Sequence, residues 1–316
     1  MVSGRSQIAR ATLACAALAC IALACASSPT APTAELTAAP IPKVELLSPG
    51  SAPLRLLRLA PKAGARELMT LTAKMGTGMN FEAGKGPPVM AMPPIVLTCE
   101  LVATEPAADG TFEMHFTILA AAADPDPAFP IDLAVALASA VEPLVGLKGW
   151  SRMNDRGITL ASNIGLSPNA DPATRQLVDN LAGSLTQLGA PLPLEAVGVG
   201  ARWRVVRELE GDARIRQTTM VELTELVGVN ATLRLDISQT AARQRIKAPG
   251  LPATTVVELV SLEGEGDAEI AIDLGKLVPD ASHLDMRTLV KALVTGDDQK
   301  LPLALGTTLS VDIAPR

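Results

Sequence analysis

Alternation of apolar and polar residues with a period of two runs through most of this chain after residue 44 and constrains its fold more than any other feature. In residues 111–118 the even positions, Phe112 to Ile118, are apolar and the odd positions are polar. The same alternation recurs in residues 231–237 and 266–274. One apolar face and one solvated face are typical of an antiparallel sheet that covers a core. We therefore expect a mainly antiparallel β protein.

Helical patterns are few. Residues 171–188 begin with Asp171 and Pro172, which suit the start of a helix, and carry leucines on one stripe. A weaker pattern predicts a second helix over 282–294. Residues 131–144 fit either a short helix or a buried strand, and periodicity does not decide between them.

Short matches recur in the same order in the two halves of the chain. Residues 64–66 and 200–202 are both Gly-Ala-Arg, and residues 100–102 and 225–227 are both Glu-Leu-Val ahead of a turn and a strand pattern. Coincidence in a long antiparallel chain is the alternative explanation. The pattern predicts an α+β fold with two similar curved sheets, formed by internal duplication, and a few amphipathic helices. The predicted units are 44–199, with its helix near 171–188, and 200–316.

The N-terminus has the composition of a secretory signal. Arg5 and Arg10 precede a stretch, residues 11–26, whose only polar side chain besides the cysteines is Thr12. This stretch is too short to span a bilayer comfortably. We expect residues 1–24 to be a signal peptide, and residues 25–43, rich in Pro, Ala, Ser and Thr, to be a tether.

Cys25 is the expected lipidation site. The pattern Leu-Ala-Cys occurs three times, at Cys15, Cys20 and Cys25. Cleavage before Cys15 would leave too short an apolar region, and cleavage before Cys20 would leave an apolar tetrapeptide beside the anchor. An ordinary secreted protein cut at a small-residue site is the alternative. Ala26, rather than Asp, follows Cys25, which favours the outer membrane over the inner one.

Two sequence blocks carry a family resemblance. Residues 191–195, Pro-Leu-Pro-Leu-Glu, lead into Val-Gly-Val-Gly-Ala at 197–201 and then Trp203. This block, with Gly-Glu-Gly at 264–266 before a strand pattern that ends in Asp-Leu, resembles an uncharacterised bacterial lipoprotein family with a lipobox-type signal peptide. The resemblance implies a place in the cell envelope. That family has no assigned function, so the resemblance supplies no catalytic residues.

Composition and motifs argue against several functions. The net charge of −6, which falls to −8 once Arg5 and Arg10 leave with the signal, is unsuited to nucleic acid. His115 and His283 lack metal-ligand companions at zinc spacing, and no hydrolase motif is present. Cys99, the only cysteine expected to remain besides Cys25, lies on the apolar face of a strand pattern and should be buried and inert. We expect no enzyme, no cofactor and no metal site.

Four methionines gather in a Gly- and Pro-rich region, at Met75, Met79, Met90 and Met92. They could close the end of a sheet, contact an apolar ligand, or bind Cu(I) through their thioethers.

These observations predict a membrane-anchored envelope lipoprotein with a non-catalytic binding or structural role. The alternatives are a carrier of a lipid or other apolar ligand in a concave sheet, and copper binding by the methionines. The expected partners are the membrane, reached through the lipid anchor, and a lipid ligand or an envelope protein. Nucleic acid is not an expected partner.

Overall fold

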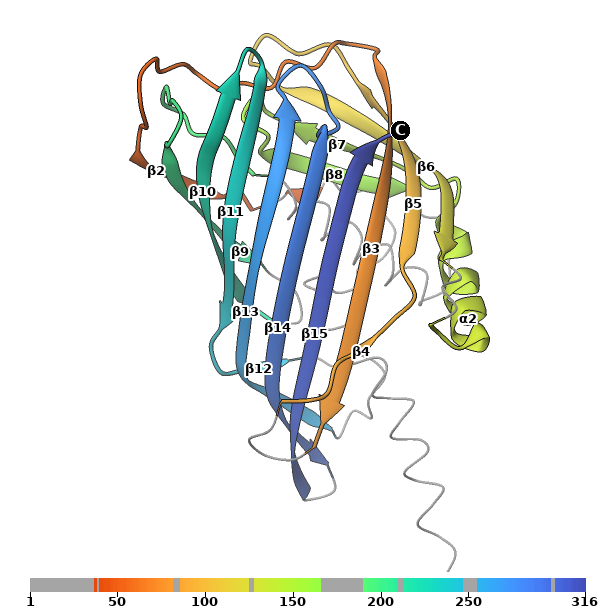
Figure 1. Cartoon of the computed structure of the whole chain (residues 1–316). Coiled ribbons are helices and arrows are strands. Elements are labelled where there is room, and N and C mark those ends of the chain that lie inside the picture. Colours follow the sequence, from red (N-terminus) through yellow and green to blue (C-terminus); the bar gives the residue numbers. More distant parts are fainter. Residues whose placement is uncertain are drawn as a thin grey trace, which may run out of the picture.

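One antiparallel sheet dominates the fold (Figure 1). The structure is a computed structural model that describes residues 37–38, 40–81, 86–124, 128–165, 190–209, 213–246, 255–296 and 299–316. The strands are β1 (Thr37–Ala38), β2 (Lys43–Ser48), β3 (Arg66–Asn80), β4 (Met90–Ala91), β5 (Ile95–Ala103), β6 (Phe112–Ala123), β7 (Lys148–Met153), β8 (Thr159–Gly165), β9 (Arg202–Leu209), β10 (Ile215–Val227), β11 (Asn230–Ala241), β12 (Gln244–Ile246), β13 (Val256–Asp273), β14 (Ala281–Gly296) and β15 (Gln299–Pro315).

The strand order is β1-β8-β7-β6-β5-β3-β15-β14-β13-β11-β10-β9-β2, with β4 beside β3 and β12 beside β13. In the first half of the chain, β3 is followed by neighbouring strands β5, β6, β7 and β8. In the second half, strands β9 to β15 lie side by side and end with β15 next to β3. The two halves meet because β15 pairs with β3 from Ala304 opposite Asn80 to Pro315 opposite Met69. The prediction of two similar sheets in an α+β fold is therefore wrong. Matches between two meanders cannot reveal that the last strand of one pairs with the first strand of the other.

The predicted set of amphipathic helices is also wrong. Residues 282–294 lie in β14, where Leu284, Val290 and Ala292 are buried at even positions. Leu289 and Leu293 add apolar residues at odd positions. Together with Val290 they have the spacing of one face of a helix, which explains the wrong prediction. Residues 131–144 form helix α2 (Ile131–Val141) and a short 3-10 turn (Glu142–Leu144) beside β6. The predicted helix near 171–188 lies outside the described residues.

The sheet curls until its two edges approach each other (Figure 1). β1 pairs with β8 at one edge, and β2 pairs with β9 at the other. Only residues 39–42 separate β1 from β2 in the sequence. An extended residue spans at most about 3.6 Å, so the five steps from Ala38 to Lys43 cover no more than about 18 Å. The two edges of the open sheet therefore lie within about 18 Å of each other along this connection. β1 lies within the residues expected to form the tether.

The core lies on the inner face. One row of buried side chains in direct register crosses six adjacent strands: Trp203, Val221, Leu235, Ala268, Leu284 and Val311. The opposite face of β13 carries exposed acidic side chains at alternate positions from Glu263 to Glu269, as its alternation predicted. Burial of the inner face removes apolar surface from water and is the main source of stability.

The segment between β2 and β3, residues 49–65, crosses the upper end of the sheet in Figure 1 and closes it. We call it the strap. Arg55 of the strap forms a β-bridge with Val197. The Leu59 N–H donates to the Asp155 carbonyl at 2.7 Å, and the Ala60 N–H donates to the Leu274 carbonyl at 2.7 Å. The strap is thus held to the 190–201 segment and to the turns that follow β7 and β13.

The lower end is built differently. Residues 87–89 fold over the outer surface of β3 and β15, where Gly76, Gly78 and Gly306 leave the space for them. A Cβ on Gly78 would overlap the Pro88 carbonyl, and a Cβ on Gly306 would lie 3.0 Å from Cγ of Pro87. These glycines are needed because the backbone of another segment approaches the sheet closely.

Candidate functional site

A row of six polar residues and one glycine crosses the inner face below the main core. Its members are directly opposite one another on seven neighbouring strands, from β9 to β3: Arg207, Gln217, Gln239, Gly264, Thr288, Thr307 and Thr77. We call it the polar row. It occupies inward positions, where the strands otherwise carry mostly apolar side chains.

The two glutamines next to Arg207 in the polar row are buried, with 3% of Gln217 and 8% of Gln239 exposed. The amide of Gln239 donates to Oε1 of Gln217 at 2.9 Å. Gln217 in turn lies 3.5 Å from the hydroxyl of Thr219. A Cβ on Gly264 would lie 3.1 Å from Cβ of Gln239, so the glycine leaves room for that side chain. Burying amides costs free energy unless hydrogen bonds replace those to water.

Arg207 stands at the β9 end of the polar row. Burial lowers the pKa of its guanidinium to about 10. The group therefore still carries its positive charge at neutral pH, and it gives this end of the row a charge.

Apolar side chains flank the polar row on both sides. The next row towards the upper end includes Val205, Ile237 and Leu309, which belong to the main core or pack against it. On the lower side, a second cluster has five buried residues: Ile215, Leu259, Leu262, Val290 and Leu305. A third cluster at the lower end contains Val257, Ala292 and Leu303. The inner face thus alternates from apolar to polar to apolar along the strands.

The four methionines border this face. Met75 and Met79 lie on β3 with the parity of its buried residues, and Met79 packs against the third cluster. Met90 pairs with Thr77, and the Met92 N–H donates to the Met75 carbonyl at 2.7 Å. Residues directly opposite each other on antiparallel strands project to the same face. The register therefore aligns all four thioethers with the inner side of the β3–β4 edge, and Met90 is 73% exposed there.

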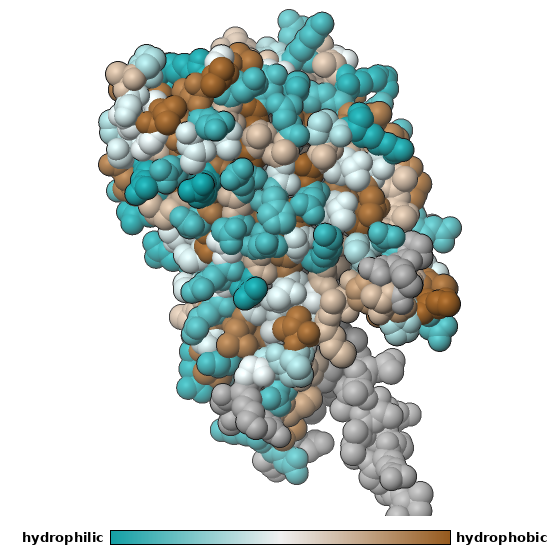
Figure 2. Space-filling view, viewed as in Figure 1, coloured by the Kyte–Doolittle hydropathy of each residue, from teal (hydrophilic) through white to brown (hydrophobic). Residues whose placement is uncertain are grey.

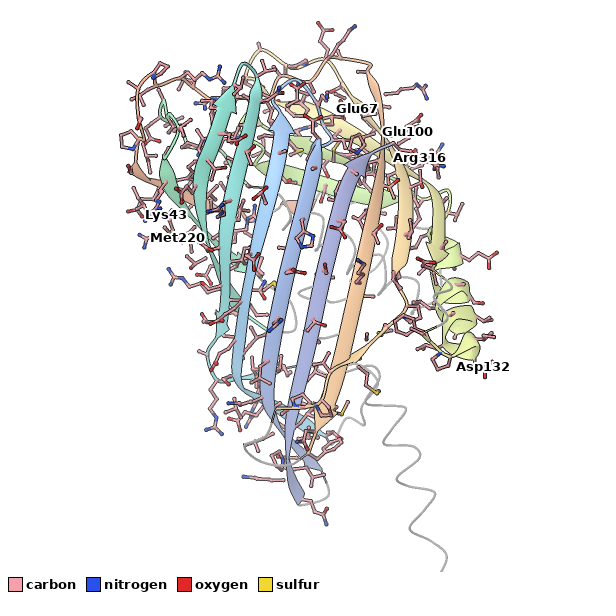
Figure 3. The ribbon with its side chains drawn as sticks, in the orientation of Figure 1. Lys43, Glu67, Glu100, Asp132, Met220 and Arg316 are labelled. Carbon is pink, nitrogen blue, oxygen red and sulfur yellow. The ribbon has the colours of Figure 1, made fainter. Side chains whose placement is uncertain are left out.

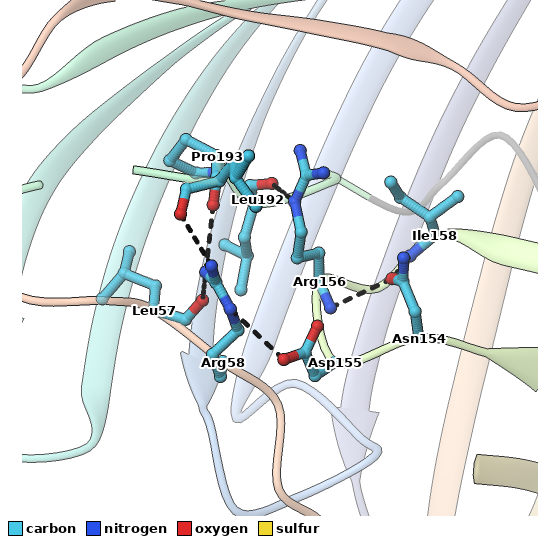
Figure 4. Close-up of polar contacts among 9 residues, drawn as sticks. Leu57, Arg58, Asn154, Asp155, Arg156, Ile158, Leu192 and Pro193 are labelled. Atoms are coloured by element: carbon cyan, nitrogen blue, oxygen red, sulfur yellow. Dashed lines mark hydrogen bonds and ion pairs between the residues drawn. The ribbon is translucent and has the colours of Figure 1, made fainter. Parts of the chain in front are cut away.

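Two arginines connect the strap, the 190–201 segment and the β7–β8 turn at the upper end (Figure 4). Arg58 donates to the carbonyls of Leu57, Pro193 and Leu194 at 2.7, 3.0 and 2.7 Å, and its Nε lies 3.2 Å from the Asp155 carboxylate. Arg156 donates from Nε to the Leu192 carbonyl at 2.7 Å. These bonds satisfy carbonyl groups of irregular backbone that the closed end would otherwise leave without partners.

The strongest histidine contacts lie on the outer face. His283 is 2.7 Å from a carboxylate oxygen of Asp312 and 3.2 Å from one of Asp285. The hydrogen bond with Asp312, followed by that with Asp285, raises the pKa of His283. Within the described ranges, no group of three or more His, Cys, Asp or Glu side chains could hold a metal ion.

Cys99 is buried in β5, as predicted, and burial raises the pKa of its thiol to about 11. A thiol with so high a pKa is a poor nucleophile at neutral pH. His115, on the neighbouring strand β6, is exposed.

A shallow groove of about 160 Å³ lies on the outer face, at the edge where Lys43 is labelled in Figure 3. Its lining includes the ion pair of Arg204 with Glu45 at 2.7 Å, which holds the pKa of Glu45 below its usual value. The groove is smaller than typical small-molecule sites.

The polar row was not predicted from the sequence. The signal was present, because Gln217 and Gln239 interrupt apolar alternation at inward positions. Only the register shows that these residues, 22 positions apart, are direct neighbours. Cys25, the predicted lipidation site, lies outside the described residues.

Comparisons with known proteins identify no relative. No protein-family model matches the chain, and no curated protein matches it. Among solved structures, a triple mutant of the porin of Rh. blastica is 7% identical with a TM-score of 0.22, and the match covers 78% of this chain and all of that one. Another triple mutant of the same porin is 8% identical with a TM-score of 0.18 and the same coverage. Likeness at this level bears on neither fold nor function. Among the described residues, no helix combines the length and apolar character needed to cross a membrane.

Proposed function

We propose that this chain is a lipid-anchored, non-catalytic protein of the bacterial cell envelope that binds a lipid or similar amphipathic molecule on the inner face of its sheet. The observation that carries the proposal is the polar row between two apolar regions. A ligand with a hydrogen-bonding group between apolar parts, such as an acyl ester or amide, matches that sequence of surfaces. Apolar contact would supply most of the affinity, and the polar row would fix the position of the ligand.

The cellular location rests on the N-terminal sequence. Acylation of Cys25 with two or three chains would give stable anchoring, since each buried methylene contributes about 0.8 kcal/mol. Residues 26–36 would then connect the anchor to β1. We place the protein at the outer membrane because of Ala26.

The methionines fit the same role. Their thioethers are flexible and polarisable, which suits contact with apolar chains of different shape. They would contact an apolar chain that lies between the exposed β4 edge and the third cluster. Copper binding remains an alternative, and Cu(I) titration of the chain with and without Met90→Leu would test it.

Native mass spectrometry, followed by lipid extraction, tests the proposed function on the soluble chain starting at Ser27. We expect a reproducible extra mass that is released as one lipid class. A clean mass for the protein alone, persisting after incubation with envelope lipids, would refute lipid binding and favour a structural or interaction role in the envelope.

A matched pair of double variants tests the polar row itself. Replacing Gln217 and Gln239 by Leu should change the retained lipid class or lower its occupancy, because the hydrogen-bonding group of the ligand loses its partners. The control is Thr218→Val with Ser238→Ala, which alters the outward residues next to the two glutamines on the same two strands. The control should retain the lipid of the original chain.

A further inference from the structure

A group of exposed apolar side chains lies at the upper, strap-closed end of the sheet. The six residues are Leu54, Leu56, Leu194, Val199, Val227 and Val229, and between 43% and 72% of each is exposed. We call them the apolar rim. Figure 2 shows apolar residues gathered at this end of the molecule, towards the upper left.

Hydrogen bonds bring the three parts of the apolar rim together. The Arg55 guanidinium, between the two strap leucines, donates to the carbonyl of Gly228, which lies between the two valines of the β10–β11 turn. The Ser51 N–H donates to the Val199 carbonyl at 2.8 Å, and Arg58 donates to the Leu194 carbonyl at 2.7 Å. Side chains on such firmly connected loops form a fixed surface. Exposed apolar groups of this kind are typical of protein or membrane contact sites.

The place where the tether joins the sheet favours contact with a membrane over contact with a protein. The described structure begins at β1, where Ala38 pairs with Ala161, and Ala161 is only four residues from Gly157 in the β7–β8 turn at the upper end. Four strand residues span about 13 Å, whereas the 17 residues of β15 span about 55 Å. The tether therefore joins the sheet near the end that carries the apolar rim. Twelve residues from Cys25 to Thr37 reach at most about 43 Å.

We infer that the apolar rim rests on the lipid surface of the membrane that holds the anchor, so that the sheet stands on its closed end with the β4 edge and the methionines directed away from the bilayer. The inference rests on the anchor in the proposed function but not on ligand binding. Apolar side chains that enter the headgroup region add to the affinity of a lipid anchor and limit its rotation.

The experiment uses the full lipidated chain reconstituted in vesicles of phosphatidylethanolamine and phosphatidylglycerol that contain a spin-labelled lipid. Single fluorophores are attached through Val227→Cys at the apolar rim or Leu301→Cys at the lower end, where the exposed leucine is a matched position. Cys99 should stay unlabelled because it is buried and its pKa is raised to about 11. We expect the label at position 227 to be quenched several-fold more strongly than the label at 301.

Adding Leu54→Gln and Leu56→Gln to the Val227→Cys chain should remove most of that difference, while adding Val256→Gln at the lower end should not. Equal quenching at both ends would overturn the inference, as would protection of the rim by a bound protein. The intact mass of the same sample reports acylation of Cys25, so failure of the anchor is recorded separately. A chain without acyl groups still tests the rim, because the vesicles then quench its label only if the rim itself binds lipid.

Discussion

The upper and lower halves of the same curled sheet differ in how they are filled. Among the residues that the structure describes, the upper half holds one cluster of 25 buried apolar residues, closed by the strap and by Arg58 and Arg156. In the same described ranges, the lower half holds clusters of five and three buried apolar residues, separated from the main core by the polar row. Strands such as β13, β14 and β15 run through both halves. The upper end of each long strand should therefore contribute more to stability than the lower end.

The largest effect should come from the core of the upper half. Trp203 is fully buried, and its indole N–H donates to the Pro191 carbonyl at 2.8 Å. Trp203→Ala should lower the free energy of unfolding by about 3–5 kcal/mol. Urea denaturation measures the change. Leu301→Ala in the lower half should cost less than about 0.5 kcal/mol, because the side chain is 49% exposed. Similar costs at both positions would contradict the expected contribution of the buried Trp203 side chain to stability.

The second-largest loss of stability should follow removal of the hydrogen bonds that Arg58 makes between the strap and residues 190–201. Arg58→Ala leaves carbonyl groups of the closed end without their donor, and we expect a loss of about 2 kcal/mol in unfolding free energy. Hydrogen exchange should rise first in the strap and in residues 190–201. The control is Arg66→Ala, because Arg66 is 72% exposed and has an ion pair with Glu100. Such surface pairs contribute about 0–1 kcal/mol. Unchanged exchange in the strap would show that Arg58 does not hold it.

The polar row allows a sharper test, by a double-mutant cycle. Gln217→Leu or Gln239→Leu alone leaves one buried amide without its partner and should cost about 1–2 kcal/mol. The double variant should cost less than the sum of the two, because neither amide remains. Urea midpoints of the four chains measure the coupling. Additive costs would mean that the hydrogen bond between Gln239 and Gln217 contributes nothing, and that the polar row is not one unit.

The smallest effect concerns the outer face. Because Asp312 and Asp285 raise the pKa of His283, the folded state favours its protonated form. Its contribution to stability is complete below the ordinary histidine pKa of about 6.5 and is lost as the pH rises through the raised value. Asp312→Asn should lower the His283 pKa in an NMR titration. It should also reduce the stability that the protein loses as the pH rises through the His283 pKa. Asp236→Asn, on the same face but on β11, should change the pKa much less. Equal changes would indicate long-range charge rather than the two hydrogen bonds.

The sequence predicted local structure well where one face is solvated. Residues 111–118 and 231–237 are strands, Cys99 is buried, and the acidic positions of β13 face water, because period-two patterning directly reflects a half-buried sheet. It failed at β14, where apolar residues at both parities hid the alternation. It also failed for the number of sheets, since the pairing of β15 with β3 joins residues more than 200 positions apart. The polar row depends on the same distant register, so only its individual members could be seen in the sequence.

The position of β15 has a consequence for how the protein is made. The last seventeen strand residues of the chain lie in the middle of the sheet, between β14 and β3, and the N–H of Arg316 still donates to the Leu68 carbonyl at 2.9 Å. The sheet therefore cannot be completed until β15 has been synthesised. Pairing across such sequence separations is slow, so this sheet should be completed later than one built from local hairpins alone.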